Sequence, residues 1–278
     1  MAALLDSQFY RSLPGIALAL DEGLASTTET LSVFYGERMP WFINVTALGP
    51  TGHGSRFIEN TAVEQLIELC NKALEFRQGQ RELLGMQEHE NCSHAVAAAK
   101  KTNTLGDVTS LNITTLEAGV KVGNAYAHNC VPPKAQCSLD IRISPHTDPS
   151  EIATMLDSWC RECTKNEKLP MQWAQHHKRN LDKHNMTSTD PEQNPWYAVF
   201  ESTLKQMNFS VEPQIFPAAT DSRFLRALGI RALGFSPMRS TEILLHENDE
   251  YIPEHTFVEG IGIFVGLIYT LGAQGKDL

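Results

Sequence analysis

Residues 41–56 read Trp41-Phe-Ile-Asn-Val-Thr-Ala-Leu-Gly-Pro-Thr-Gly-His-Gly-Ser-Arg56, and their character changes half-way along. The first half has an apolar strand pattern, and from residue 59 onward apolar residues recur at the spacing of a helix. Glycines on both sides of His53 therefore place a histidine at the corner between a strand and a helix, where its side chain can reach a ligand. We predict a functional role for His53, the alternative being an ordinary turn residue.

The segments that follow continue the alternation of strand and helix. Strand patterns occur at 108–116, 136–143 and 171–174, the mostly polar residues 85–106 predict a loop, and Asp148-Pro149-Ser150-Glu151 has the capping residues that begin a helix. Over residues 41–174 the order is strand, helix, strand, strand, helix, strand, which is typical of the ferredoxin-like fold. Such a sheet keeps a free strand edge, which favours pairing with a second subunit.

Outside this region, strand and helix patterns alternate as in an open α/β sheet. The apolar run Ile16–Leu20 predicts a strand buried on both faces. Residues 260–273 are uncharged and shorter than the ~20 residues that span a bilayer, so we expect a buried helix there. The remaining elements are expected as strands at 31–35, 211–216 and 231–235 and as helices beginning at Asn194 and spanning 221–228 and 257–273.

Composition limits the classes of protein to which the chain can belong. Its 278 residues suggest two domains at about 150 residues each, and the net charge of −10 disfavours nucleic acid and anionic membranes as partners. The first residues lack the pattern of a secretory signal, so we expect a cytoplasmic protein whose six cysteines are free thiols. The pair Cys160 and Cys163 has CxxC spacing, and we interpret both as core thiols.

Six short strings resemble the zinc-dependent aminoacylase/carboxypeptidase family. Each string alone is weak, but together they run in family order through nearly the whole chain, within residues 16–24, 39–56, 107–143, 193–226 and 232–250. The strings are Ala19-Leu-Asp-Glu-Gly23, Gly52-His53-Gly54-Ser-Arg56, Asn129 with Asp140-Ile-Arg142, Pro217-Ala-Ala-Thr-Asp221, Gly234-Phe-Ser-Pro-Met238 and Leu244-Leu-His246.

The resemblance implies an α/β protein in two parts. A zinc-peptidase-like catalytic domain, here partial, would comprise residues 1–38 and 179–278. It would be interrupted at 39–178 by a ferredoxin-like βαββαβ domain that forms a homodimer and covers the active site as a lid. The implied activity is hydrolysis of N-acyl-L-amino acids to free amino acid and carboxylate, assisted by two zinc ions.

The resemblance also implies roles for individual residues. Glu22 would bind one zinc ion and His246 the other, while His53 would reach into the partner subunit's site and stabilise the oxyanion. The implied substrate-binding residues are Asn129, Arg142, Gly234 and Ser236, with the guanidinium of Arg142 suited to a carboxylate.

The expected metal site is incomplete. The family's first zinc histidine, its bridging aspartate and its Glu-Glu pair precede the segment of Glu22, and this chain begins too late to contain them. His146-Thr-Asp148 copies the letters H-x-D, but Asp148 is better suited to capping a helix. Because catalytic zinc normally needs three protein ligands, we expect impaired activity. We also expect unburied apolar faces on Ile16–Leu20 and on the last helix.

Several alternatives stay open. Glu22 and His246 could be solvated or structural residues, Arg142 could pair with a nearby acid, and neither Thr220 nor Asp221 can be assigned between a site and a structural role. The chain could instead be a non-catalytic dimerisation or regulatory partner of full-length subunits. A third possibility is a peptidase of the same family.

Overall fold

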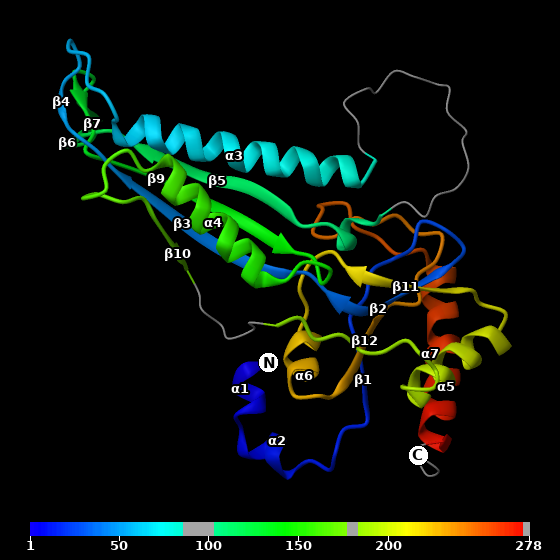
Figure 1. The fold of residues 1–278 in the computed structure, drawn as a ribbon. Coiled ribbons are helices and arrows are strands. Elements are labelled where there is room, and N and C mark those ends of the chain that lie inside the picture. Colours follow the sequence, from blue (N-terminus) through cyan, green and yellow to red (C-terminus); the bar gives the residue numbers. More distant parts are fainter. Residues whose placement is uncertain (86–102, 177–182, 275–278) are drawn as a thin grey trace. The chain divides into compact units, whose positions relative to one another are not determined.

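The computed structural model describes residues 1–85, 103–176 and 183–274 (Figure 1). The chain divides into two compact units, which are described separately. Unit 1 comprises Met1–Glu37 and His184–Leu278, and unit 2 comprises Arg38–Lys183.

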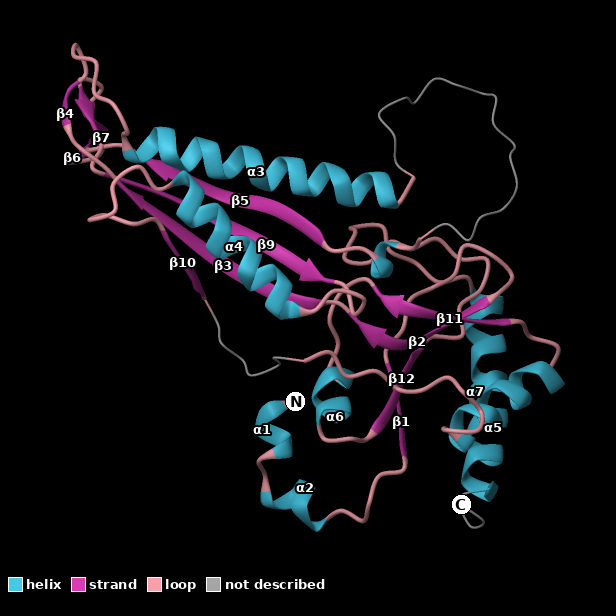
Figure 2. Ribbon diagram, viewed as in Figure 1, coloured by secondary structure: helices cyan, strands magenta, loops and turns pink. Residues whose placement is uncertain are grey.

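Unit 2 is a four-stranded antiparallel sheet covered by two helices. The strands lie in the order β10 (Gln172–Gln175), β3 (Met39–Leu48), β9 (Lys134–Ile143), β5 (Ser110–Ala118). The helices α3 (Ala62–Leu83) and α4 (Pro149–Cys163) lie side by side along it (Figure 2). Along the chain this is β3, α3, β5, β9, α4, β10, so the predicted ferredoxin-like order is confirmed.

The core of unit 2 forms where the inward side chains of the strands meet the two helices. Ile43 and Ile141 of the sheet, Leu69 of α3 and Leu156 of α4 are all fully buried in it. Cys160 and Cys163 are also buried there as free thiols, as predicted, and burial raises the pKa of Cys160 to about 12.

Both helices of unit 2 begin at side-chain caps that satisfy free backbone N–H groups. Thr61 and Glu64 form a reciprocal capping box at the start of α3. Asp148 accepts the N–H of Ser150 at 2.8 Å, and Pro149 occupies the first turn of α4. The predicted helix start at Asp148 is therefore confirmed.

Five further short elements lie in the described part of unit 2. A 3-10 helix covers Leu105–Asp107, and β6 (Lys121–Val122) pairs with β7 (Ala125–Tyr126) in a hairpin. The short strand β4 (Gly52–His53) pairs antiparallel with β8 (Cys130–Val131). The sequence patterns did not predict these pairings. The central part of the loop expected at 85–106 lies outside the described residues.

Unit 1 contains a mixed four-stranded sheet. Its order is β1 (Leu18–Asp21), β12 (Arg231–Phe235), β2 (Leu31–Glu37), β11 (Val211–Phe216), with β1 parallel to β12 and β11 parallel to β2. The helices are α1 (Ala2–Leu5), α2 (Gln8–Ser12), α5 (Pro195–Gln206), α6 (Ser222–Ala227) and α7 (Glu254–Gln274). A second core joins the sheet to α5 and α7.

Two burial predictions for unit 1 are wrong. β1 is only half-buried, because it is an edge strand with a single neighbour. The last helix is buried along one face only, and 22% of its 18-residue apolar stretch lies inside the structure. The expectation of an unburied apolar face is thus confirmed, with exposed Phe257, Val258, Ile261, Val265, Ile268 and Tyr269. By length and composition α7 could cross a membrane, but core helices of soluble proteins can have the same length and composition.

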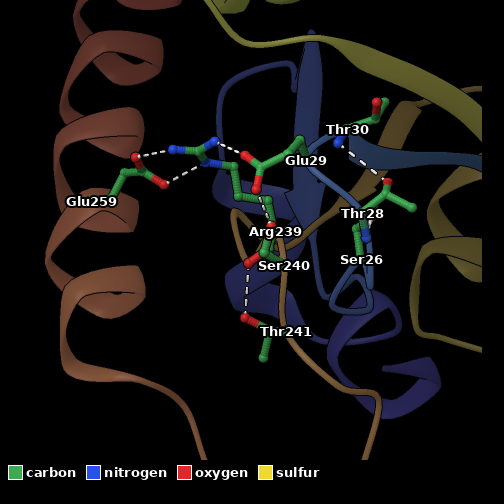
Figure 3. A network of polar contacts seen from close by, with 8 residues as sticks. All are labelled: Ser26, Thr28, Glu29, Thr30, Arg239, Ser240, Thr241 and Glu259. Atoms are coloured by element: carbon green, nitrogen blue, oxygen red, sulfur yellow. Dashed lines mark hydrogen bonds and ion pairs between the residues drawn. The ribbon is translucent and has the colours of Figure 1, made fainter.

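A polar cluster ties α7 to the loop after β12 and to the loop between β1 and β2 (Figure 3). The guanidinium of Arg239 donates two hydrogen bonds to Glu259 of α7, both 2.8 Å long, and also contacts Glu29. Ser240 donates to the same Glu29. The hydrogen bonds from Arg239 lower the pKa of Glu259 and in turn the carboxylate raises the pKa of Arg239.

Candidate functional site

His53 is exposed at one end of the sheet of unit 2, where it is the last residue of the short strand β4. We call this end the tip: β4, the turn up to Ile58, the β6–β7 hairpin and β8. The β4–β8 pairing sets His53 opposite Cys130, and the N–H of Gly54 donates to the carbonyl of Asn129 at 2.8 Å. The structure therefore brings together two predicted site residues that are far apart in the sequence, His53 and Asn129.

The ring of His53 is oriented by Ser55. The N–H of Ser55 points at Nδ1 of His53 at 3.2 Å, and the Ser55 hydroxyl lies 2.8 Å from the same atom. Because Nδ1 accepts a backbone N–H, the neutral ring carries its proton on Nε2. In this tautomer His53 can offer the N–H of Nε2 to a developing negative oxygen, which is the chemistry an oxyanion donor needs.

Arg142 lies at the opposite end of the same sheet. In the β3–β9 ladder it stands opposite Pro40, whereas Lys134, at the start of β9, stands opposite Leu48. Arg142 follows Lys134 by eight positions along β9, a distance of roughly 26 Å at about 3.3 Å per residue. Arg142 and the tip of one chain therefore cannot hold the same small molecule.

The guanidinium of Arg142 is held by its surroundings. It donates two hydrogen bonds to Asp140, from Nε at 2.7 Å and from Nη2 at 3.0 Å, and it lies over the ring of Phe42. Burial lowers the pKa of the neighbouring Arg38 to about 10, and the positive charge of Arg142 contributes to that shift. The nearby acid that the sequence left as an alternative partner for Arg142 is Asp140.

Three predicted site residues, Glu22, Gly234 and Ser236, meet at the carboxyl ends of β1 and β12 in unit 1. The N–H of Gly23 donates to Oγ of Ser236 at 3.1 Å. A Cβ added to Gly234 would lie 2.6 Å from the carbonyl oxygen of Glu22, so only glycine permits this close approach. Glu22 itself is exposed. In parallel sheets, ligands bind at the carboxyl ends of the strands, where this cluster lies.

His246 occupies an exposed turn between β12 and α7. Its backbone has a φ of 65°, an uncommon conformation for a residue with a side chain. Throughout residues 1–85, 103–176 and 183–274, no three His, Cys, Asp or Glu side chains gather closely enough to hold a metal ion. The donors that the structure describes therefore do not fit a complete catalytic zinc centre, which needs three protein ligands.

The His146-Thr-Asp148 string has structural contacts instead of metal contacts. Asp148 caps α4, and Nε2 of His146 lies 3.2 Å from a carboxylate oxygen of Asp107. Both side chains are thus used in holding loops and a helix end.

Thr220 also has a structural partner. Its N–H and its hydroxyl both donate to Oε2 of Glu37, at 2.6 and 2.7 Å. Burial raises the pKa of Glu37 despite these bonds and the nearby Arg226. Asp221 precedes α6 without a side-chain capping bond. The sequence held no signal for this buried cluster, because Glu37 lies more than 180 residues from Thr220 and Arg226 in the chain.

An apolar cavity of about 650 Å³ opens beside Ser236. Its walls come from the loop after β12, from the residues before α7 and from the first turns of α7, and Glu250 stands among them. The volume is in the range of small-ligand pockets. Sequence reasoning identified the Gly234–Pro237 part of this wall but missed the part from 250 to 264.

Comparison with known proteins shows which fold the chain resembles. Residues 35–168 match the family described as peptidase dimerisation domain. Among solved structures, the M20 family metallo-carboxypeptidase of Sulfolobus solfataricus aligns with a TM-score of 0.60 at 14% identity, covering 94% of this chain and 64% of that one. The fold of the described residues is therefore similar to part of an M20 family metallo-carboxypeptidase, and the residues that match the peptidase dimerisation domain lie almost entirely in unit 2.

Within that class, the chain is similar to aminoacylase-1. It is 43% identical to aminoacylase-1 of Dictyostelium discoideum over 273 residues, covering 98% of this chain and 62% of the relative. It is 42% identical to aminoacylase-1A of Rattus norvegicus over 255 residues, covering 92% of this chain and 56% of the relative. The family resemblance drawn from the sequence is confirmed. The chain spans about three-fifths of the length of these relatives.

Proposed function

We propose that this chain carries part of the active site of a zinc-dependent amidohydrolase that cleaves N-acyl-L-amino acids. Its similarity to aminoacylase-1 along 98% of its length supports the reaction class, and the dimerisation domain at 35–168 supports a homodimer formed through residues 39–178. The products would be a free amino acid and a carboxylate.

The observation that carries the proposal is the position of the candidate residues within unit 2. His53 and Asn129 lie at the tip, and Arg142 lies at the end where the chain enters the unit. A small substrate cannot span the roughly 26 Å between them. One active site would therefore combine Arg142 of one copy with His53 and Asn129 of the second copy, so each copy completes the site of the other.

Each residue has a role suited to its chemistry. The fork of Arg142, already oriented by Asp140, would bind the carboxylate of the substrate in a bidentate way. His53 would donate from Nε2 to the oxyanion, and the amide of Asn129 would hold the substrate beside it. Gly234 and Ser236 would form the pocket floor at the carboxyl ends of β1 and β12.

Glu22 and His246 are the proposed metal ligands, one for each of two zinc ions. Because the described donors do not fit a complete zinc centre, the roles above are limited to the chain's own side chains. For the same reason we propose that the 278-residue chain hydrolyses substrates weakly by itself.

The first test is zinc-dependent hydrolysis of N-acetyl-L-methionine by the purified chain, with His246→Ala as the control for contaminating enzyme. Turnover that the substitution abolishes would support the proposal. A folded dimer without turnover would favour the alternative, a non-catalytic dimerisation or regulatory partner. Parallel assays with dipeptides would separate the aminoacylase from a peptidase of the same class.

A mixing experiment tests the exchange of residues between copies. Chains with His53→Ala and chains with Arg142→Ala should each be inactive alone. After mixing, heterodimers regain one intact site, giving about a quarter of wild-type activity when subunits exchange at random. No recovery in a mixture shown to contain heterodimers would contradict the exchange and would place both residues in the same copy's site.

We also propose a cytoplasmic location. The cysteines at positions 70, 130, 137, 160 and 163 are free thiols, as expected in a reducing compartment. Fractionation of cells that express a tagged chain would check this, and recovery from a secreted fraction would contradict it.

A further inference from the structure

The tip presents an aromatic side chain that the fold of its own chain does not use. Phe57 is fully exposed, more so than any other large apolar residue in the described part of the chain. Single exposed apolar residues are common on protein surfaces, so exposure alone carries no conclusion. The position of this one matters, because it lies four residues after His53 on the same loop.

Contacts of the neighbouring residues fix the turn around Phe57, whereas the ring of Phe57 is exposed to solvent. The carbonyl of His53 accepts the N–H of Arg56 at 3.0 Å, which closes a turn. Ile58 packs against Gly52, where an added Cβ would lie 2.5 Å from its Cδ1. Phe57 is therefore displayed by a fixed turn, and Arg56, its exposed neighbour, adds a positive charge beside it.

Unit 1 contains a cavity that matches this feature. The 650 Å³ cavity beside Ser236 has apolar walls. The side chains that form these walls are Met238, Tyr251, Ile252, Phe257, Ile261 and Phe264. Glu250 lies in the same wall and supplies a negative charge. An aromatic ring preceded by an arginine would meet an apolar cavity bordered by a carboxylate.

We propose that Phe57 of one copy inserts into this cavity of a second copy, with Arg56 paired to the partner copy's Glu250. This contact rests on the proposed function only in requiring that the chain forms a homodimer. The tip lies within residues 35–168, which match the peptidase dimerisation domain. A closed two-fold pair would make this contact twice, because each copy owns one tip and one cavity. Phe57 and Arg56 are thus positioning residues for His53.

The geometry links this contact to the proposed active site. Phe57 follows His53 by four positions, so the chain between them can reach at most about 14 Å. In the cavity wall, Oγ of Ser236 accepts a hydrogen bond from the N–H of Gly23, the residue next to Glu22. Seating Phe57 in the cavity would therefore place His53 within reach of the carboxyl ends of β1 and β12, where the candidate metal and substrate residues lie.

Photo-cross-linking of the full chain tests the contact without relying on catalysis. We would replace Phe57 with p-benzoylphenylalanine and mix isotopically light and heavy chains, so that mass spectrometry separates links between copies from links within one. The expected links join position 57 of one copy to residues 236–238 or 250–264 of the other. The same probe at Leu74, half-exposed on α3, should not link to those residues.

Exchanging the charges of Arg56 and Glu250 tests whether these two residues pair between copies. Arg56→Glu alone and Glu250→Arg alone should each reduce the link at least tenfold, and the double variant should restore it to within threefold of the unmodified chain. Links only within one copy, links to unit 2 of the second copy, or no rescue by the double variant would overturn the proposal.

The two proposals can fail separately. A chain without zinc-dependent turnover that still gives the link between copies would keep this contact and reject the proposed activity. A chain whose turnover requires His53 but which gives no link from position 57 would reject the contact and keep the activity.

Discussion

Glu37 and Arg226 form the most deeply buried charged pair that the structure describes. Oε1 of Glu37 and Nη1 of Arg226 lie 3.9 Å apart, and neither atom has a hydrogen-bond partner in the described structure. Burial raises the pKa of Glu37 and lowers the pKa of Arg226, so each charge is costly without the other. The rest of the guanidinium donates to the carbonyls of Ala232 and Phe34, which joins α6 to the sheet.

Arg226→Met should therefore lower the free energy of unfolding of unit 1 by about 3 kcal/mol at pH 8, because the carboxylate of Glu37 is left buried and unpaired. Without the cation, the folded-state pKa of Glu37 rises further above its unfolded value. A raised carboxyl pKa means that stability is present at low pH and is lost as the pH rises through that pKa. The loss should thus be smaller at pH 5.

Urea unfolding of both chains at pH 5 and pH 8 measures this difference, with the exposed Arg231→Met as the control. An equal loss at the two pH values would show that the missing hydrogen bonds, not the unpaired carboxylate, account for the effect.

At the scale of elements, α4 and α7 differ in where their stability comes from. α4 begins at a local signal, the cap at Asp148, and its apolar stripe meets the sheet of unit 2. α7 has one face in the core of unit 1, with Ile263 and Leu267 fully buried, and an opposite face that is apolar but exposed. The cap acts within one turn, whereas burial depends on distant partners.

Removing the cap of α4 should cost about 1 kcal/mol of unfolding free energy in Asp148→Ala. The reason is that the N–H of Ser150 loses its acceptor. Asp148→Asn retains a side-chain oxygen at this position and should remain within about 0.3 kcal/mol of the unmodified chain. Chemical denaturation followed by circular dichroism compares the two, and an equal loss in both would mean that the charge, not the capping bond, matters.

The two faces of α7 should respond differently to the same truncation. Leu267→Ala leaves a cavity in the core and should cost about 3 kcal/mol, whereas Ile268→Ala, on the exposed face, should change stability by less than about 0.5 kcal/mol. Thermal unfolding under matched conditions checks both. A large loss for Ile268→Ala would mean that this face is covered in solution.

At the scale of the whole molecule, the two units differ in completeness. The sheet of unit 2 is covered by α3 and α4, and its inward side chains are fully buried. Unit 1 leaves β1 half-buried at an edge and leaves much of α7 exposed. Segments with fewer buried apolar contacts open more readily, so local stability should follow this difference.

Hydrogen exchange should show slow exchange in β3 and β9 of unit 2 and faster exchange in β1 and α7 of unit 1. Mass spectrometry of peptides from both units, at a concentration where the chain is dimeric, measures this directly. Comparable protection of the two units would show that unit 1 is as stable as unit 2 and would contradict the prediction.

The local sequence determined the elements of this protein and several of their ends. The strand pattern at Trp41–Thr46, the helical spacing after residue 59 and the cap at Asp148 depend on neighbours within a few residues, so the pattern predicted them correctly. The ordered strings also predicted the family. For the site, the glycines around His53 indicated an accessible corner, and in the structure His53 is exposed at the end of the short strand β4.

Only the tertiary structure decided which of these residues meet. It set Asn129 beside Gly54 through the β4–β8 pairing, placed Arg142 at the far end of the same sheet, and buried Glu37 against Arg226. It also left one face of α7 exposed where an apolar sequence predicted burial. The physical reason is the same in each case: pairing register and burial depend on partners tens to hundreds of residues away, which no local pattern records.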